Sequence, residues 1–217
     1  MKKEFWIEKW QNKQIGFHKD FTHPLLIQYL QLLKLSKGDT VFVPLCGKSI
    51  DMLWLNDQGY QVIGVELSEL AIEEFIDENK LKATQDREGG FKIYHFENIT
   101  IYQGDFFALN KEIMSSVNAV YDRAALIALP DDLVKKYSTK MLEIIPKSAK
   151  QLLITLEMNR KTGSLGPPFS TSSEKVKRLY GASKSIQLVQ EVDIIEREEH
   201  FQKQGCEFVY ERVYLIE

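Results

Sequence analysis

The sequence predicts an α/β fold, a doubly wound, mostly parallel seven-stranded sheet with antiparallel terminal strands. Short apolar runs alternate with amphipathic stretches, which is the pattern of a parallel sheet with helical crossovers. The run 40–44 (TVFVP) is almost wholly apolar, as expected of a parallel strand that is covered on both faces. The last two apolar runs have too little chain between them for a long helical crossover, so one of them is expected to be antiparallel.

The expected elements follow in chain order. Helices are expected where apolar residues recur at helical spacing: 4–10, 25–33, 50–58, 69–79 and 131–145. Strands are expected at 40–44, 60–66, 117–122, 151–158, 186–195 and 208–216, with 91–96 and 99–103 as a hairpin. The polar stretch 80–90 ends in two glycines and is expected to be a surface loop. The stretch 159–173, rich in Gly, Pro, Ser and Thr, is a loop long enough to suggest a role.

Composition excludes several classes of protein. The 217 residues carry 28 basic and 31 acidic side chains, interspersed, with a net charge of −3, so no nucleic-acid partner is expected. No apolar stretch approaches the roughly 18 residues of a membrane span, and the start lacks the apolar core of a secretory signal. We expect one domain over 1–217, a monomer in the cytoplasm with no membrane partner. Two cysteines, and histidines without ligand partners at suitable spacing, predict no metal site.

The turn after the first strand, Val43-Pro44-Leu45-Cys46-Gly47-Lys48-Ser49, resembles part of a phosphate-binding loop. That motif requires a glycine at position 42, which is Phe42. Pro44 has no N–H to contribute to a phosphate cradle. The dinucleotide fingerprint G-x-G-x-x-G is also absent, which disfavours a nicotinamide-dependent oxidoreductase. The turn is therefore expected to hold a ligand that has no phosphates.

Glu66 ends the second strand 66 − 47 = 19 residues after Gly47. This is close to the offset of roughly 20 at which an acidic side chain reaches a ribose hydroxyl in doubly wound sheets. A carboxylate accepts from both hydroxyls of an unphosphorylated ribose, and on this kind of fold such a nucleoside is most often S-adenosylmethionine. The alternative is that Glu66 is a solvated residue after a strand and Gly47 an ordinary turn residue.

Several motifs occur in a coherent order from Phe5 to Arg123. They include Trp6-Ile7-Glu8-Lys9-Trp10, Ile15-Gly16-Phe17-His18, the run from Val43 to Met52, Val62-Ile63-Gly64-Val65-Glu66-Leu67-Ser68, Gly104-Asp105-Phe106-Phe107 and Tyr121-Asp122-Arg123. With them the chain resembles the thiopurine S-methyltransferases. Gly166-Pro167-Pro168-Phe169 and the closing strand extend the resemblance more loosely.

The resemblance implies a class I methyltransferase-like fold and S-adenosylmethionine-dependent methyl transfer to aromatic or heterocyclic thiols. It implies cofactor contacts at Trp10, Leu45, Glu66 and Arg123. Related enzymes act on halides, small thiols, or selenium and tellurium species. A non-catalytic nucleoside-binding protein is a further alternative, because the pocket residues do not by themselves demonstrate turnover.

The remaining candidates each have two interpretations. Trp10 either covers the cofactor or packs on the core. Arg123 either holds the carboxylate of the cofactor or polarises the acceptor, and the alternative is a surface salt bridge with Asp122 or Asp131. Asp105 either accepts from the adenine amino group or caps a turn, and Phe106 either flanks adenine or belongs to the core.

The acceptor is expected to be a small-molecule thiol between aromatic walls. Phe17 and Phe169 are the candidates, and the amino-terminal helix is expected to close over the site as a lid. Because an aromatic thiol ionises near neutral pH, no dedicated general base is expected. Cys46 is not expected to act as a nucleophile, since transfer from a sulfonium needs no covalent intermediate.

Overall fold

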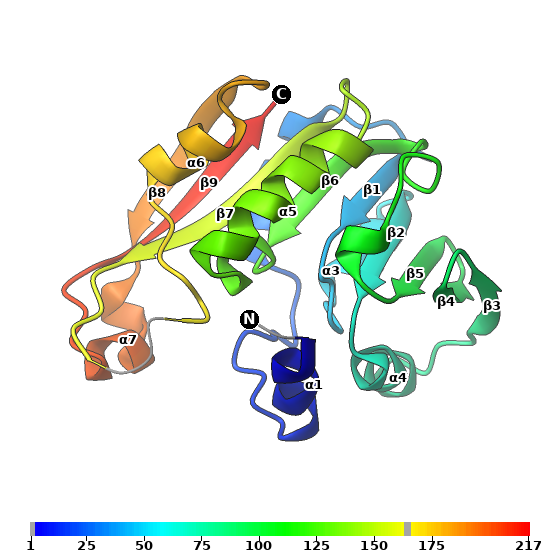
Figure 1. Ribbon diagram of the computed structural model, residues 1–217, viewed down its shortest axis with the longest axis horizontal. Coiled ribbons are helices and arrows are strands. Elements are labelled where there is room, and N and C mark those ends of the chain that lie inside the picture. The colour runs from blue at the N-terminus through cyan, green and yellow to red at the C-terminus, as the bar shows by residue number, and fades with distance from the viewer. Residues whose placement is uncertain (1–2, 163–165) are drawn as a thin grey trace.

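The structure is a computed structural model that describes residues 3–162 and 166–217 (Figure 1). Its helices are α1 Lys3–Gln11, α2 Pro24–Tyr29, α3 Asp51–Asp57, α4 Glu69–Glu78, α5 Asp131–Ile144, α6 Ser173–Tyr180 and α7 Glu199–Lys203. Its strands are β1 Thr40–Val43, β2 Gln61–Glu66, β3 Thr84–Glu88, β4 Phe91–Phe96, β5 Ile99–Gln103, β6 Val117–Arg123, β7 Lys150–Met158, β8 Ile186–Asp193 and β9 Val209–Ile216. Short 3₁₀ turns are η1 Leu30–Leu33, η2 Phe106–Ala108, η3 Leu126–Ala128 and η4 Ile195–Arg197.

Within the described residues the strands form one nine-stranded sheet in the order β3-β4-β5-β2-β1-β6-β7-β9-β8. The strands from β5 to β7 are parallel. At the two sides, β3 and β4, and β9 and β8, pair antiparallel. The doubly wound, mostly parallel fold with antiparallel terminal strands is confirmed, whereas the expected number of seven strands was wrong.

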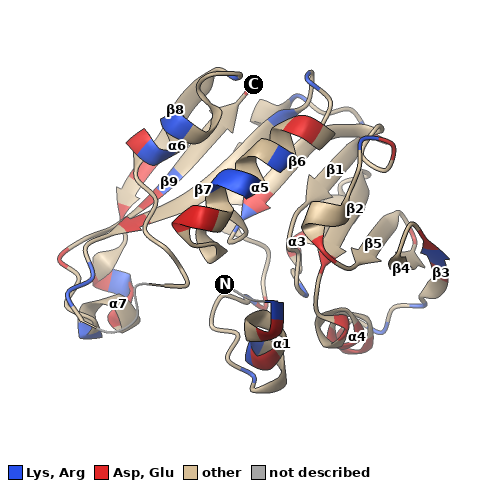
Figure 2. Cartoon of the chain, viewed as in Figure 1, with Lys and Arg blue, Asp and Glu red and all other residues tan. Residues whose placement is uncertain are grey.

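The additional edge strand β3 lies where the sequence predicted a surface loop. Thr84 to Glu88 pair with His95 to Phe91 of β4. All five side chains of β3 are exposed, so the stretch has no apolar alternation by which a strand is recognised in sequence. Its place in the sheet comes from backbone hydrogen bonds. Charged side chains of both signs on β3 protect this edge from pairing with another chain (Figure 2).

The sheet separates two hydrophobic cores because successive side chains of a strand point to opposite faces. Val41 and Val43 of β1 pack on one face with residues of α2, α3 and α4, such as Leu26. Phe42 packs on the other face with residues of η2, α5 and α6, such as Tyr137. The contiguous apolar run of β1 is explained by this burial on both sides.

Polar side chains cap two of the helices that cover the first face, α2 and α4. The hydroxyl of Ser68 accepts from the N–H of Ala71 at the start of α4, which is typical of an N-cap. Before α2, the Nδ1 atom of His23 accepts from the N–H of Leu25, and Pro24 occupies the first turn. No helix in the described ranges is long and apolar enough to cross a membrane.

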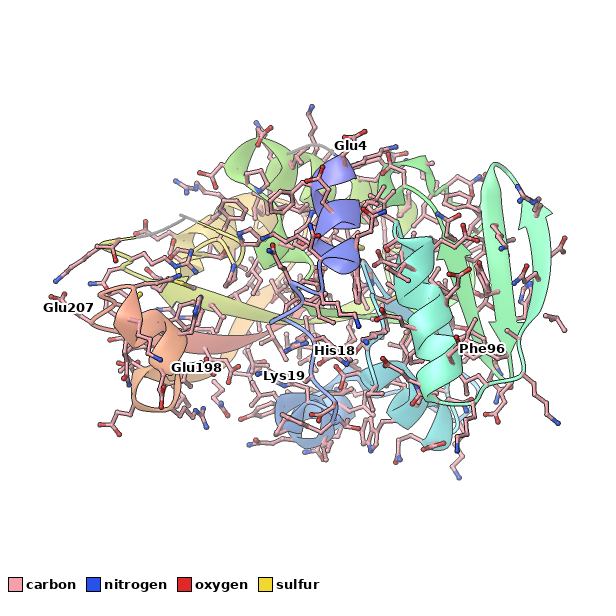
Figure 3. The ribbon with its side chains drawn as sticks, turned by 90° about the horizontal axis from the view of Figure 1, so that it is seen from below. Glu4, His18, Lys19, Phe96, Glu198 and Glu207 are labelled. Carbon is pink, nitrogen blue, oxygen red and sulfur yellow. The ribbon has the colours of Figure 1, made fainter. Side chains whose placement is uncertain are left out.

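The strand order reverses at β1, which has β2 on one side and β6 on the other. In sheets of this kind the ligand crevice lies beyond the carboxyl ends of the strands at the reversal. Helix α1 lies next to α4 at this end of the molecule (Figures 1 and 3). The amino-terminal helix therefore lies at the end where a ligand is expected.

Candidate active site

The turn after β1 is held against the end of β2. The N–H of Cys46 donates to the carbonyl of Val65 at 2.9 Å. Leu45 and Gly47 both have left-handed backbones, with φ of +46° and +53°, a conformation that is strained for leucine and free of strain for glycine. A Cβ on Gly47 would lie 3.0 Å from Cζ2 of Trp10. Glycine at this position therefore allows both the turn and the close approach of Trp10.

The Glu66 carboxylate joins this turn to the start of α4. Its Oε2 accepts from the N–H of Gly47 at 2.9 Å, and its Oε1 accepts from the N–H of Ser68 at 2.7 Å. Burial raises the pKa of Glu66 above its usual value, and the two N–H groups act in the opposite direction. A carboxylate has roughly four acceptor positions, so two remain for other donors. This is the buried acceptor expected to meet a ribose.

The N-terminal segment, residues 3–23, covers the ends of the strands. The rings of Trp10 and Phe17 meet edge to face, with centroids 5.6 Å apart. The carbonyl of Phe17 accepts from Nη1 of Arg123 at 3.1 Å. In the view from below, His18 and Lys19 lie on the chain that leads from α1 across the middle of the molecule (Figure 3). Arg123, at the end of β6, thus holds the N-terminal segment in place.

Asp105 contacts the same segment from the other side. It follows β5, where its Oδ1 accepts from the N–H of Phe107 at 3.0 Å and its Oδ2 pairs with Nζ of Lys3 at 2.8 Å. The neighbouring Phe106 is buried, and its ring lies 4.7 Å from that of Tyr137. Asp105 therefore caps a turn, and Phe106 packs in the core. Their roles toward adenine stay predictions.

A cavity of about 40 Å³ lies between the N-terminal segment and the strand ends. Five of the predicted site residues line it, namely Trp10, Phe17, Leu45, Gly47 and Arg123. Glu66 lies behind Gly47, and the described lining does not include Asp105, Phe106 or Phe169. This volume is far below the roughly 300–1,000 Å³ of pockets that hold small molecules. In this conformation the cavity is too small to hold a nucleoside.

The cavity also has a polar wall that the sequence did not reveal. Oδ1 of Asp51 accepts from the N–H of His23 at 2.7 Å, and its Oδ2 accepts from the hydroxyl of Tyr121 at 3.0 Å. All three residues line the cavity. The only signal in the sequence was that Tyr121 precedes Arg123 by two positions on one strand, which places both on one face. Asp51 and His23 are 28 positions apart in the chain, and they meet only in the folded structure.

Burial determines the protonation states of His23 and Tyr121 on this wall. Burial, followed by the positive charges of Arg123 and Lys19, lowers the pKa of His23 to about 4. Burial, followed by the charge of Asp51, raises the pKa of Tyr121 well above its usual value. At neutral pH, His23 is therefore uncharged and Tyr121 keeps its proton. Nε2 of His23 faces Oε1 of Glu211 at 3.8 Å.

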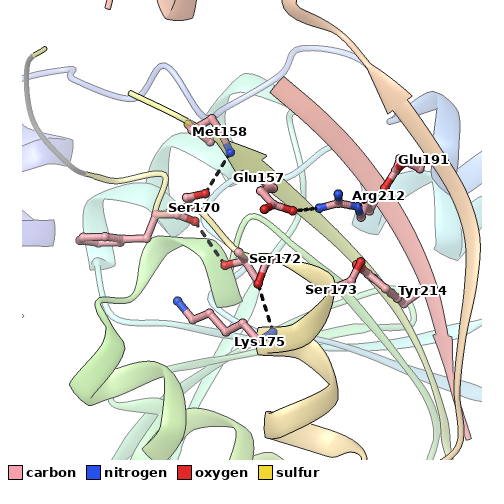
Figure 4. Close-up of polar contacts among 11 residues, drawn as sticks. Glu157, Met158, Ser170, Ser172, Ser173, Lys175, Glu191, Arg212 and Tyr214 are labelled. Atoms are coloured by element: carbon pink, nitrogen blue, oxygen red, sulfur yellow. Dashed lines mark hydrogen bonds and ion pairs between the residues drawn. The ribbon is translucent and has the colours of Figure 1, made fainter. Parts of the chain in front are cut away.

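Phe169, the second predicted acceptor wall, is anchored near the end of β7. Its N–H donates to the carbonyl of Ile127 at 2.6 Å, and the hydroxyl of Ser170 accepts from the N–H of Met158 at 2.9 Å (Figure 4). The predicted loop 159–173 includes residues 163–165, which lie outside the described residues. Contact of Phe169 with an acceptor stays a prediction.

Over residues 3–162 and 166–217, no group of three or more His, Cys, Asp or Glu side chains is placed to hold a metal ion.

This doubly wound sheet, with a buried carboxylate at the end of β2 and a turn without a phosphate cradle after β1, is the fold of S-adenosylmethionine-dependent methyltransferases. The solved structure of a Burkholderia thailandensis 1,6-didemethyltoxoflavin-N1-methyltransferase, which contains S-adenosylhomocysteine, superposes with a TM-score of 0.64. The match covers 98% of this chain and 86% of that chain, at 11% identity.

The chain belongs to the thiopurine S-methyltransferase (TPMT) family, whose model matches residues 1–217. It is 40% identical to a thiopurine S-methyltransferase of Pseudomonas aeruginosa, over 100% of this chain and 99% of that protein. It is 42% identical to the thiopurine S-methyltransferase of Shewanella putrefaciens, with the same coverage. The resemblance seen in the sequence is confirmed.

Proposed function

We propose that this protein transfers a methyl group from S-adenosylmethionine to the sulfur of aromatic and heterocyclic thiols, such as thiopurines. The observation that carries the proposal is the buried Glu66 carboxylate, which hydrogen-bonds Gly47 across the ends of β2 and β1. The site fits an unphosphorylated nucleoside, because acceptor positions remain on Glu66 and Pro44 offers no phosphate-binding N–H. The names of full-length relatives support sulfur as the methyl acceptor.

The residues proposed to hold the donor are Trp10, Leu45, Gly47, Glu66, Asp105, Phe106 and Arg123. S-adenosylmethionine, when bound, supplies an electrophilic methyl group on a positively charged sulfur. Glu66 accepts hydrogen bonds from the ribose hydroxyls, and the indole face of Trp10 attracts the positive charge, an interaction of about 0.5–2 kcal/mol. The backbone and side chain of Leu45 line the same turn. Asp105 and Phe106 serve the adenine end.

The N-terminal segment is proposed to be a lid. It contacts three donor-site residues, through Lys3 to Asp105, Trp10 to Gly47 and Phe17 to Arg123. It therefore has to open to admit the donor and closes again over the bound molecule. Limited proteolysis with trypsin at Lys13 tests this, because S-adenosylhomocysteine is expected to slow cleavage there. Unchanged cleavage would contradict a lid.

Positioning is proposed to supply most of the catalysis. Holding the thiol sulfur in line with the methyl group and its sulfonium contributes about 7–11 kcal/mol in favourable cases. Arg123 stabilises the thiolate and orients it, with its permanent charge. Phe17 and Phe169 form apolar walls around the acceptor, and the closed lid excludes water. An aromatic thiolate forms near neutral pH, so none of the side chains acts as an indispensable base.

We also propose a single domain, 1–217, that works as a monomer in the cytoplasm, without a nucleic-acid or membrane partner. Lys and Arg are mixed with Asp and Glu over the view in Figure 2, which supports the absence of a basic binding face. Light scattering after size exclusion tests the monomer. A stable dimer at micromolar concentration would contradict it.

The function is tested by two measurements on the same preparation. Calorimetry with S-adenosylhomocysteine measures binding at the donor site. Transfer of a labelled methyl group is then measured with a thiopurine, an aryl thiol, selenite and a halide as acceptors. Transfer to the thiols supports the proposal. Binding without transfer to any acceptor indicates a non-catalytic nucleoside-binding protein, and absence of binding contradicts the site.

A further inference from the structure

A buried carboxylate lies on the wall of the cavity under the lid. Asp51 is the first residue of α3 and is 2% exposed. It lines the cavity together with Tyr121 and Arg123 of β6. These two residues are two positions apart on their strand, so both side chains leave the same face of the sheet. The proposed donor site makes no use of Asp51, so its place on this wall calls for a different role.

The hydrogen bonds around Asp51 determine what the wall offers a ligand. One carboxylate oxygen accepts from the N–H of His23, and the other accepts from the hydroxyl of Tyr121. The phenol has a single hydrogen and gives it to Asp51, so it offers only lone pairs to other groups. Two of the roughly four acceptor positions of the carboxylate remain. Asp51 and Tyr121 can therefore accept hydrogen bonds from a ligand but have none to donate.

Arg123 contributes hydrogen-bond donors and a positive charge to the same cavity. One of its N–H groups donates to the carbonyl of Phe17, and a guanidinium has five such donors. The imidazole of His23 does not compete for a ligand, because Nδ1 accepts from the N–H of Leu25 and Nε2 faces Glu211. A molecule that enters this space meets a cationic donor and a carboxylate acceptor.

We propose that Asp51 is a specificity-determining residue, whose carboxylate accepts a hydrogen bond from a ring N–H adjacent to the acceptor sulfur. A heterocyclic thiol in its thione form carries an N–H donor directly beside a sulfur that can accept from Arg123, which matches this pair of residues. An aryl thiol has no such hydrogen and leaves the buried acceptors of Asp51 unpaired, which is costly in a closed site. This inference rests on the proposed function, because it concerns the acceptor of that reaction.

The hydrogen bond also assists the transfer. When the ring N–H donates to a carboxylate, electron density rises on the conjugated sulfur outside the ring. A lone pair of this sulfur forms the new bond to the methyl carbon, and the electrons of the broken bond stay on the donor's sulfur. After the transfer the ring proton stays hydrogen-bonded to Asp51 until the lid opens and then leaves to water, so the released methylated heterocycle is neutral.

The test compares 2-mercaptopyridine, whose N–H adjoins the sulfur, with thiophenol. The ratio of their kcat/KM values is measured for the unmodified protein and for Asp51→Asn. We expect this ratio to fall at least tenfold in Asp51→Asn. It is expected to stay unchanged in Asp57→Asn, which removes an exposed carboxylate from the same helix. An unchanged ratio in Asp51→Asn, with S-adenosylhomocysteine still bound, would overturn the inference.

A second measurement needs no substitution at Asp51, which also holds His23 and Tyr121. With S-adenosylhomocysteine bound, calorimetry compares 2-pyridone, which has an N–H beside its oxygen, with phenol. We expect 2-pyridone to bind at least tenfold more tightly, and equal affinities would overturn the inference. Failure of the unmodified protein to methylate either thiol contradicts the proposed function instead, so the two failures are distinguishable.

Discussion

The carboxylate of Glu66 and the backbone N–H of Gly47 lie 2.9 Å apart, although 19 residues separate them in the chain. This hydrogen bond joins the ends of two neighbouring parallel strands, β1 and β2. It orients a buried acid toward the turn that Trp10 covers. The proposed donor site thus contains a side chain that also holds two parts of the fold together.

Glu66→Gln is expected to weaken the binding of S-adenosylhomocysteine. The amide keeps one acceptor oxygen but loses the charge, and hydrogen bonds to a charged group contribute about 1.5–3 kcal/mol. We therefore expect a dissociation constant raised about tenfold to a hundredfold, measured by calorimetry. Glu69→Gln is the matched control, because Glu69 pairs with Lys92 on the surface. Equal affinities of the two variants would contradict the proposed role of Glu66.

Arg123→Ala is expected to slow methyl transfer moderately. The variant loses the cation that is proposed to stabilise the thiolate, and it loses the hydrogen bond to the carbonyl of Phe17. We expect kcat to fall about tenfold to a hundredfold, with the pH dependence of the rate shifted upward because the thiol ionises less readily. Arg123→Lys keeps the charge and is expected to retain more of the rate. If one His or Asp replacement abolished activity while the donor still bound, an indispensable base would be indicated.

Gly47→Ala separates backbone strain from contact with the lid. Gly47 and Gly89 have similar left-handed backbones, with φ of +53° and +57°, which cost a residue with a Cβ roughly 1–2 kcal/mol. Alanine at 89 would meet nothing within 4 Å, whereas alanine at 47 would meet Trp10. We expect both variants to lose stability in chemical denaturation. Only Gly47→Ala should speed trypsin cleavage at Lys13, and equal cleavage of both variants would argue against the Trp10 contact.

The parts of the fold that could be predicted are those in which burial requires a regular pattern of apolar residues. The apolar run of β1 was predicted because a strand that is covered on both faces requires apolar residues along its whole length. β3 was missed because its side chains are all exposed and its pairing depends on backbone groups. Backbone hydrogen bonds are the same for every residue type except proline, and leave little trace in sequence.

The same distinction applies to the site. Gly47 and Glu66 were placed together because the ends of adjacent parallel strands meet at one edge of a sheet. Asp51 was missed because its contacts with His23 and Tyr121 span 28 and 70 residues. They depend on how α2 and α3 are oriented against β6. Orientation of this kind follows from packing and has no local sequence signal.

Stability is expected to depend on pH through Asp122, which lies beside Arg123 on β6. Its buried carboxylate accepts from the hydroxyl of Tyr137 at 2.7 Å, and from Gln151 and the N–H of Leu126. Burial raises the pKa of Asp122 from 3.8 to about 6, against these hydrogen bonds. The folded protein therefore binds a proton that the unfolded chain releases between these pH values. Its free energy of unfolding falls as pH rises through this window, by about 3 kcal/mol for this group.

Asp122→Asn removes this titration, so the variant should gain stability relative to the unmodified protein as pH rises from about 4 to 7. His23 has the opposite effect on the free energy of unfolding. Its pKa falls from 6.5 to about 4 on folding, so the unfolded chain binds the proton first. The free energy of unfolding therefore decreases as pH falls from 6.5 toward 4. In the unmodified protein the effects of Asp122 and His23 on the free energy of unfolding partly cancel. In Asp122→Asn the effect of His23 remains alone, so we expect stability to decrease more steeply as pH falls. Urea unfolding at several pH values measures both curves. A stability difference that stays constant over this range would show that Asp122 does not titrate there.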